Sequence, residues 1–222
     1  MKKSFKNYLR SFFLLTTLFF TDQVYSDGDS FEYNLYNNYG VVGTIHTPSA
    51  RTFDEGVHGL TVYYGDPNQT VTLSASPFDW FDASFFYTNV QDRPYCYDFT
   101  SETCLQDFKD KGFNVKLRLK EQGKLPAIAV GLQDFAGTGI YSSEYIVGSY
   151  GINRTDFHFG LGFGLLSGSD LNFKNPLISI SDKFNDRPGA FADQGGSLQP
   201  SRYFSGEKAA PFFGVSHVLR DK

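Results

Sequence analysis

The 222-residue sequence has only two cysteines, one methionine and one tryptophan. Two cysteines are too few for a zinc site, and no histidine lies near them to complete one. The four histidines, His46, His58, His158 and His217, lack metal-ligand spacing. The net charge of −4 gives no reason to propose nucleic-acid binding. We therefore expect no metal, no other cofactor and no nucleic-acid partner.

Long hydrophobic runs are also absent. After Phe20, no segment approaches the roughly 20 apolar residues that a membrane-spanning helix requires. Phenylalanine (24), tyrosine (14) and glycine (22) are abundant instead. Glycine and aromatic residues are poor helix formers, and aromatic residues fit pleated strands well. The mean hydropathy of −0.31 still permits a membrane β-barrel, because only every second strand residue faces lipid.

The N-terminus has the pattern of a secretory signal. Basic residues between Lys2 and Arg10 precede the uncharged, mostly apolar segment 11–20. This segment is too short to span a bilayer as a helix, and Ser26 offers a small residue for cleavage. We predict a signal peptide at residues 1–26, with a retained signal anchor as the alternative.

Period-two patterns predict strands along the rest of the chain. Between Asp156 and Leu166, five phenylalanine or leucine residues alternate with His158 and three glycines. The five apolar residues are Phe157, Phe159, Leu161, Phe163 and Leu165. A helix would scatter these phenylalanines around its surface, whereas a strand puts them on one face. Similar alternation predicts about eight strands in total. The remaining segments are Leu60–Gly65, Thr70–Ser76, Asp82–Val90, Gly112–Lys120, Ala127–Leu132, Ser143–Tyr150 and Pro211–Leu219.

The links between these strands alternate in length. The third, fifth and seventh links, at residues 91–111, 136–142 and 167–210, are the longer ones and fall on the same side of a meander. Outer-membrane barrels alternate short periplasmic turns with longer external loops. The sequence therefore predicts an all-β fold, an antiparallel meander that forms part of an outer-membrane β-barrel.

Cys96 and Cys104 lie in the third link. In an oxidising compartment they would pair and close a small loop. Two unpaired thiols are the alternative.

One polar strand face is the candidate lumen surface. Asn114, Lys116, Arg118 and Lys120 alternate with apolar residues, so they point into the lumen if the apolar face meets lipid. His158 belongs to the small-residue face of its own strand. These five residues are candidates for facing a polysaccharide. Alternatively, the charged ones pair with carboxylates on neighbouring strands.

Asp134 and Glu144 flank the turn that contains Gly137 and Gly139. A glycosidase needs two carboxylates about 5–9 Å apart. Acidic residues beside a turn are more often local caps, so we assign no catalytic residue and expect a protein without enzymatic activity.

Three blocks resemble a known family. The stretch YGVVGTIHTPSAR at residues 39–51 looks like the opening motif of YjbH-type proteins, which are outer-membrane proteins linked to exopolysaccharide biosynthesis in Gram-negative bacteria. The segment from Lys109 to Tyr150 is similar to the family's core block, including LPAIAVGL and the DFAGTG turn. Residues 204–206 and 209–215 resemble the next block.

The resemblance implies a non-enzymatic outer-membrane protein that takes part in exopolysaccharide biosynthesis or export. Expected partners are outer-membrane lipid, the exopolysaccharide, and periplasmic or lipoprotein components of the same system. Family members are longer, so we expect this chain to be an N-terminal portion, with a pre-barrel segment at 27–58 and a partial barrel at 59–222. A porin-like or adhesin-like barrel and an outer-membrane hydrolase acting on glycan or lipid remain alternatives.

Overall fold

The computed structural model describes residues 34–95, 106–190 and 198–219. The predicted signal peptide and the cysteine pair Cys96–Cys104 lie outside the described residues, so both stay predictions. Within the described ranges, no helix combines the length and apolarity needed to cross a bilayer.

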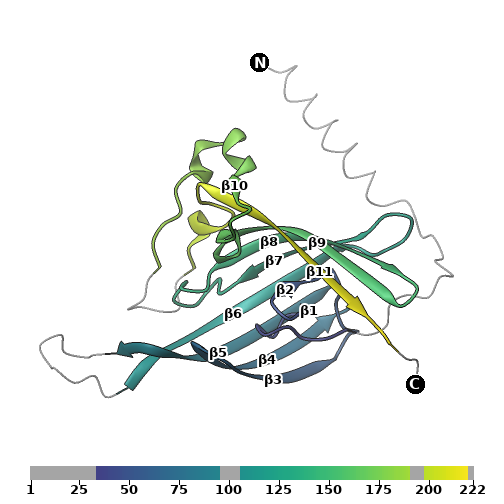
Figure 1. Ribbon diagram of the computed structural model, residues 1–222, viewed down its shortest axis with the longest axis horizontal. Helices are drawn as coiled ribbons and strands as arrows, with labels where there is room; N and C mark the ends of the chain where they lie inside the picture. The colour runs from purple at the N-terminus through teal and green to yellow at the C-terminus, as the bar shows by residue number, and fades with distance from the viewer. Residues whose placement is uncertain (1–33, 96–105, 191–197, 220–222) are drawn as a thin grey trace, which may run out of the picture.

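A single antiparallel sheet dominates the molecule (Figure 1). Its strand order is β10-β11-β9-β8-β7-β6-β5-β4-β3, so the long strands follow one another as a meander. The eight long strands are β3 (His58–Tyr64), β4 (Asn68–Phe78), β5 (Phe81–Tyr95), β6 (Gln106–Lys120), β7 (Ala127–Gln133), β8 (Ser143–Ile152), β9 (Thr155–Gly164) and β11 (Lys208–His217). The predicted all-β antiparallel meander is confirmed. Among the described residues β3 and β10 are the edges of this sheet, and no strand pairing joins them.

The period-two pattern separates two faces of the sheet. On β4, Thr72 and Ser74 are buried on the concave face, while Val71 and Leu73 point outward and are exposed. The same inversion recurs on β6, where Asn114 and Lys116 are buried and Phe113 is exposed. Soluble proteins bury the apolar face of a sheet, so this sheet has the opposite polarity.

The three longest links between long strands, which follow β5, β7 and β9, all fall at one end of the meander, as the sequence predicts, and the link after β3 at the same end is short. Residues 65–67, 96–105, 134–142 and 165–207 connect strands at one end of the meander, and 79–80, 121–126 and 153–154 at the other. The longest link contains short elements of its own among its described residues. It contains β10 (Phe173–Lys174), which pairs with β11, and the 3₁₀ turns η1 (Leu165–Ser167), η2 (Pro176–Ser179), η3 (Asp182–Phe184) and η4 (Pro200–Arg202).

This link corrects the predicted face of β9. Phe157 and Phe159 point outward, as expected, but Phe163 is only 1% exposed. Its ring lies 5.4 Å from that of Phe204, because the long link folds back over the end of the strand. Leu165 lies in η1 and not in the strand.

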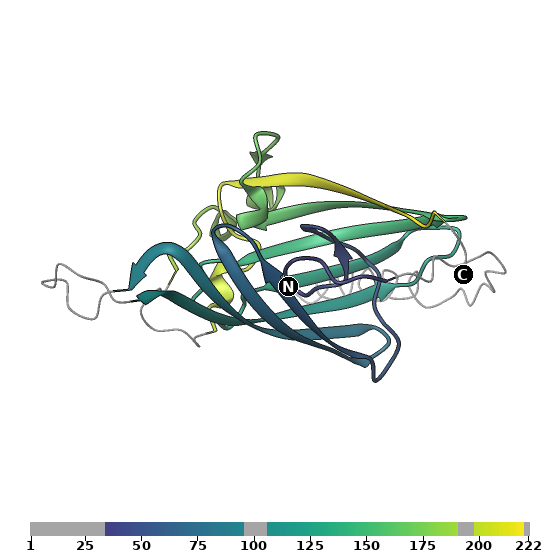
Figure 2. The same ribbon diagram turned by 60° about the horizontal axis from the view of Figure 1, so that its bottom comes forward.

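Residues 34–53, which we call the plug, lie within the curve of the sheet (Figure 2). The plug carries a small hairpin of β1 (Gly43–Thr44) and β2 (Thr47–Pro48). Gly214 of β11 lets this hairpin approach closely, since a Cβ there would lie 2.6 Å from the Thr44 hydroxyl oxygen and 2.7 Å from that of Thr47.

Candidate functional site

Polar side chains of the concave face hold the backbone of the plug. The Ser74 hydroxyl donates to the carbonyl of Gly40 at 2.7 Å, and the Asn114 amide donates to the carbonyl of Tyr39 at 3.2 Å. Irregular backbone has no ladder to satisfy its buried carbonyl groups, so side chains must supply the hydrogen bonds. The polar inner face of the wall therefore has a structural role: it binds the plug.

A bidentate ion pair fixes the C-terminal end of the plug. Nε and Nη2 of Arg51 each donate to a carboxylate oxygen of Asp156 at 2.8 Å. Beside this pair, the backbone N–H of Ala50 donates to the Ser149 hydroxyl oxygen at 2.7 Å. That oxygen also lies 2.9 Å from Nδ1 of His158. These five groups from β8, β9 and the plug form one network, because Nδ1 of His158 also lies 3.8 Å from an Asp156 carboxylate oxygen.

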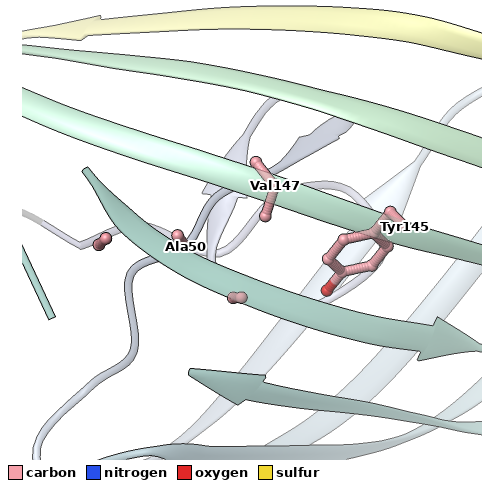
Figure 3. Close-up of a cluster of buried hydrophobic side chains, with 5 residues drawn as sticks. Ala50, Tyr145 and Val147 are labelled. Carbon is pink, nitrogen blue, oxygen red and sulfur yellow. The ribbon is translucent and has the colours of Figure 1, made fainter. Parts of the chain in front are cut away.

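A small apolar cluster adjoins this network (Figure 3). Ala50 of the plug packs with Tyr145 and Val147 of β8, and Ala127 and Ala129 of β7 complete the cluster. Small side chains on β7 leave the space that the plug and the Tyr145 ring occupy. The plug therefore contacts the wall through packing as well as through hydrogen bonds.

Two charged residues of the candidate lumen surface, Lys116 and Arg118, form ion pairs with nearby carboxylates. Nζ of Lys116 lies 2.9 Å from a carboxylate oxygen of Asp82 on β5, and it also donates to the backbone carbonyl of Arg51. Arg118 bonds Glu121 at 2.7 Å and lies 3.7 Å from Asp79. The Lys116–Asp82 pair matches the alternative in which lumen charges pair with carboxylates on neighbouring strands, whereas both partners of Arg118 lie in links.

The structure places the five predicted residues as follows. Asn114, Lys116 and His158 are buried under the plug, while Arg118 and Lys120 are half-buried toward the end of β6. Contact with a polysaccharide stays a prediction for all five. Arg51 was not among the candidates, although it is the only formally charged residue between Asn34 and Phe53. This single charge in an otherwise uncharged segment is the sequence signal that could have identified Arg51 as a site residue.

A cavity of about 270 Å³ lies between the plug and one end of the wall. Its lining includes residues of the plug turn, the β3–β4 turn, the inner faces of β4 to β7, and Tyr141 in the β7–β8 link. The Tyr141 hydroxyl donates to the Asn68 side-chain oxygen at 2.6 Å, which ties two of these links together. Burial raises the pKa of Tyr141 to about 12, so the phenol remains a donor across the neutral range.

Asp134 lies just beyond the end of β7, near this cavity. One of its carboxylate oxygens accepts a hydrogen bond from the backbone N–H of Tyr141 at 3.0 Å, and the other has no hydrogen-bond partner among the described residues. Burial and, secondarily, the charge of Asp110 raise the pKa of Asp134 to about 7. This side chain therefore titrates near neutral pH.

Glu144 is held by a different contact, which we call the clasp. Its two carboxylate oxygens accept hydrogen bonds from Arg187 of the long link at 2.7 and 2.9 Å. Arg187 also donates to the backbone carbonyls of Arg202, Ser205 and Ser142. Because the carboxylate is only 1% exposed and Phe204 N–H also donates to it, Glu144 anchors the link. A recess of about 440 Å³ lies between this link and the strand ends.

Within the described residues, no three His, Cys, Asp or Glu side chains gather as ligands for a metal ion. The site is instead a wall, a plug and a rim cavity. Residues 39–51, the first block of the sequence resemblance, lie in the plug, residues 109–150 lie in the wall and its links, and both blocks contribute to the lining of the cavity.

The family comparison covers all three parts. The model of the YjbH family, described as "Exopolysaccharide biosynthesis protein YbjH", matches residues 35–222. The chain belongs to the YjbH family. A curated relative, the "Uncharacterized lipoprotein YjbH" of Escherichia coli (strain K12), is 39% identical over 182 residues. The matched region covers 82% of this chain and 26% of that relative, so the chain spans about a quarter of the relative's length. No solved structure matches.

Proposed function

We propose that this YjbH-family chain forms part of the wall of an outer-membrane β-barrel and that it takes part, without catalysis, in the biosynthesis or export of an exopolysaccharide. The observation that carries this proposal is the inverted polarity of the sheet. The exopolysaccharide role rests on the family.

The outward face of the sheet supports a location in lipid. Leu60 and Val62 on β3 are 63% and 70% exposed, and the same outward apolar pattern continues to Phe159 on β9 and Phe213 on β11. Exposing such a broad apolar surface to water is unfavourable by roughly 25 cal/mol per Å². A bilayer removes this cost, and the antiparallel wall supplies the backbone hydrogen bonds that lipid cannot.

The plug distinguishes this proposal from a general open porin. Lys116, Asn114 and Ser74, which would line a channel, are bound to the plug's carbonyl groups. An open water-filled lumen would leave these groups to water. The filled interior supports a platform or a gated passage for the polymer.

The hydrolase alternative has little support in the site. Glu144 is enclosed by Arg187 and Phe204, and the carboxyl of Asp134 accepts the N–H of Tyr141. A general acid must reach the glycosidic oxygen within hydrogen-bond distance. These two side chains are instead bonded to the loops beside them.

Fractionation of envelopes tests the location. The expected result is co-sedimentation with outer membrane on a density gradient and retention in the membrane after a urea wash. Recovery as a soluble periplasmic protein would overturn the barrel.

A deletion of the locus tests the role. Deletion should reduce secreted polysaccharide, complementation should restore it, and the purified protein should release no reducing sugar from that polymer. Measurable cleavage that disappears on Asp134→Asn or Glu144→Gln would make the protein a hydrolase.

A further inference from the structure

We propose that the rim cavity between the plug and the β3–β4 turn binds a neutral sugar unit of one or two rings. This inference rests on the proposed function for its biological context, since it names the chemistry that the wall would recognise. The binding itself stands on the cavity's own lining.

The cavity has a suitable size. Its volume of about 270 Å³ is just below the range of roughly 300–1,000 Å³ that is typical of pockets for drug-sized ligands. Water occupies about 30 Å³ per molecule, so the space corresponds to roughly nine waters. One or two pyranose rings fit such a space, whereas a long stretch of polymer does not.

Aromatic rings supply apolar surface for a sugar. Tyr39 and His46 of the plug, with ring centroids 5.9 Å apart, line the cavity together with Tyr63 of β3. Phe86 and Tyr141 also line it. A pyranose has an apolar face of C–H groups, and tyrosine offers both a flat apolar ring and a hydroxyl group.

Side-chain amides supply hydrogen bonds of both kinds. Asn38, Asn68, Asn114 and Gln133 line the cavity, and each amide carries a donor and an acceptor. Sugar hydroxyl groups also donate and accept, so amides match them well. The Asn114 amide is already hydrogen-bonded to Tyr39, Ser84 and Asp134. By contrast, the Asn38 side chain makes no hydrogen bond to any described residue.

Gln133 gives the most direct indication of a ligand. Its side-chain oxygen accepts a hydrogen bond from Ser143 at 2.6 Å, while its buried Nε2 has no partner among the described residues. Burying a hydrogen-bond donor without a partner destabilises the folded state. A small rotation of this amide toward the cavity, where a ligand hydroxyl oxygen can accept from Nε2, would remove this cost.

The charge of the lining selects for a neutral sugar. The lining contains no lysine or arginine, and its one carboxylate is that of Asp66. Of the cations near the lining, Lys116 is paired with Asp82, and the guanidinium of Arg93, whose charge acts on Tyr141, lies over the Phe108 ring. A uronate would find no cationic partner here.

The test titrates the purified protein in detergent with glucose, galactose, maltose, lactose and cellobiose, and with glucuronate and galacturonate. Saturation-transfer NMR and calorimetry report binding. We expect at least one neutral sugar to bind with a Kd in the millimolar range, and the uronates to bind at least tenfold more weakly.

Two variants locate the site, and a neighbouring tyrosine on β3 provides a matched control. Tyr63→Ala and Gln133→Ala should each weaken binding of that sugar at least fivefold. Tyr64→Ala should leave binding unchanged, because Tyr64 is the neighbouring tyrosine on β3 and points outward. Circular dichroism and outer-membrane fractionation check that each variant folds.

Absence of binding for every neutral sugar at 20 mM would overturn this proposal. So would preference for the uronates, or equal effects of Tyr63→Ala and Tyr64→Ala. If one of these outcomes occurs while the protein still fractionates with the outer membrane, the proposal of a barrel stands. Sugar binding by a protein recovered as a soluble periplasmic species would overturn the barrel and leave the cavity assignment standing.

Discussion

Arg51 of the plug and Asp156 of β9 form a bidentate ion pair across 105 residues of sequence, with both N···O distances at 2.8 Å. The Asp156 side chain is fully buried and that of Arg51 is 14% exposed. Since Gln122 also accepts from Arg51 and bonds the backbone of Gly151, this pair connects the plug with β9, with the end of β8 and with the link at residues 121–126. It is one of several contacts between the plug and the wall.

We predict that Arg51→Met destabilises the protein by about 3–5 kcal/mol, because it leaves a buried carboxylate without its partner. Urea unfolding followed by circular dichroism measures the change. The matched control is Arg118→Met, whose partners Asp79 and Glu121 are exposed and for which we expect at most about 1 kcal/mol. Equal losses in the two variants would mean that the pair does not hold the plug.

Asp134 should make stability depend on pH. Its folded-state pKa of about 7 lies above its ordinary value of 3.8, so the folded protein holds the proton more tightly than the unfolded chain. The resulting stabilisation is full below about pH 4 and is lost as the pH rises through 7.

Asp134→Asn should therefore be more stable than the parent above pH 7, on the order of 2–4 kcal/mol, and should flatten the profile between pH 4 and 8. Unfolding free energies measured across this range provide the check. Asp170→Asn in an exposed turn is the control and should keep the parent's slope. A parent profile that Asp134→Asn leaves unaltered would contradict the prediction.

Phe159→Arg should impair insertion into membranes, because Phe159 is 67% exposed on the outward face of β9. An arginine on the lipid face of a barrel costs about 2–4 kcal/mol near the bilayer midplane. The fraction of protein assembled in the outer membrane is the measurement. Leu171→Arg, at an apolar residue in the long link that is 75% exposed, should assemble normally. Similar assembly of both variants would count against a lipid-facing β9.

The clasp between Glu144 and Arg187 should hold the long link against the wall. Glu144→Gln keeps the shape of the side chain but removes the charge, so we expect cleavage at residues 176–190 by thermolysin to accelerate at least fivefold. The control is Glu207→Gln, an exposed carboxylate in the same link, which should match the parent's cleavage rate. Unchanged cleavage of Glu144→Gln would show that other contacts fix the link.

The burial of Phe163 shows that side-chain direction can be predicted from local sequence, whereas coverage by a distant segment cannot. Alternation correctly separates Phe157 and Phe159 from His158, because side-chain direction along a strand is a local property. It places Phe163 outward by the same rule. Phe163 is buried because Phe204, in a link distant in sequence, packs against it, and no local pattern contains that contact.

The candidate site likewise combines features that the sequence predicts with contacts that only the folded structure shows. The inner direction of Asn114 and Lys116 follows from their alternation with Phe113, Val115 and Leu117, and the eight long strands follow from similar runs. That Lys116 would meet Asp82 follows only from the pairing of β5 with β6.

By itself, the amino-acid sequence determined the strands, their two unlike faces and the order of short and long links, because each depends on residues that are near one another in the chain. Only the tertiary structure decided that residues 34–53 occupy the curve of the wall, that Arg51 reaches Asp156, and that a cavity remains at the rim. These features depend on how far the sheet curves and on which distant groups its polar face must satisfy. The inner polarity is thus a property of the sequence, whereas its use in binding the plug is a property of the folded wall.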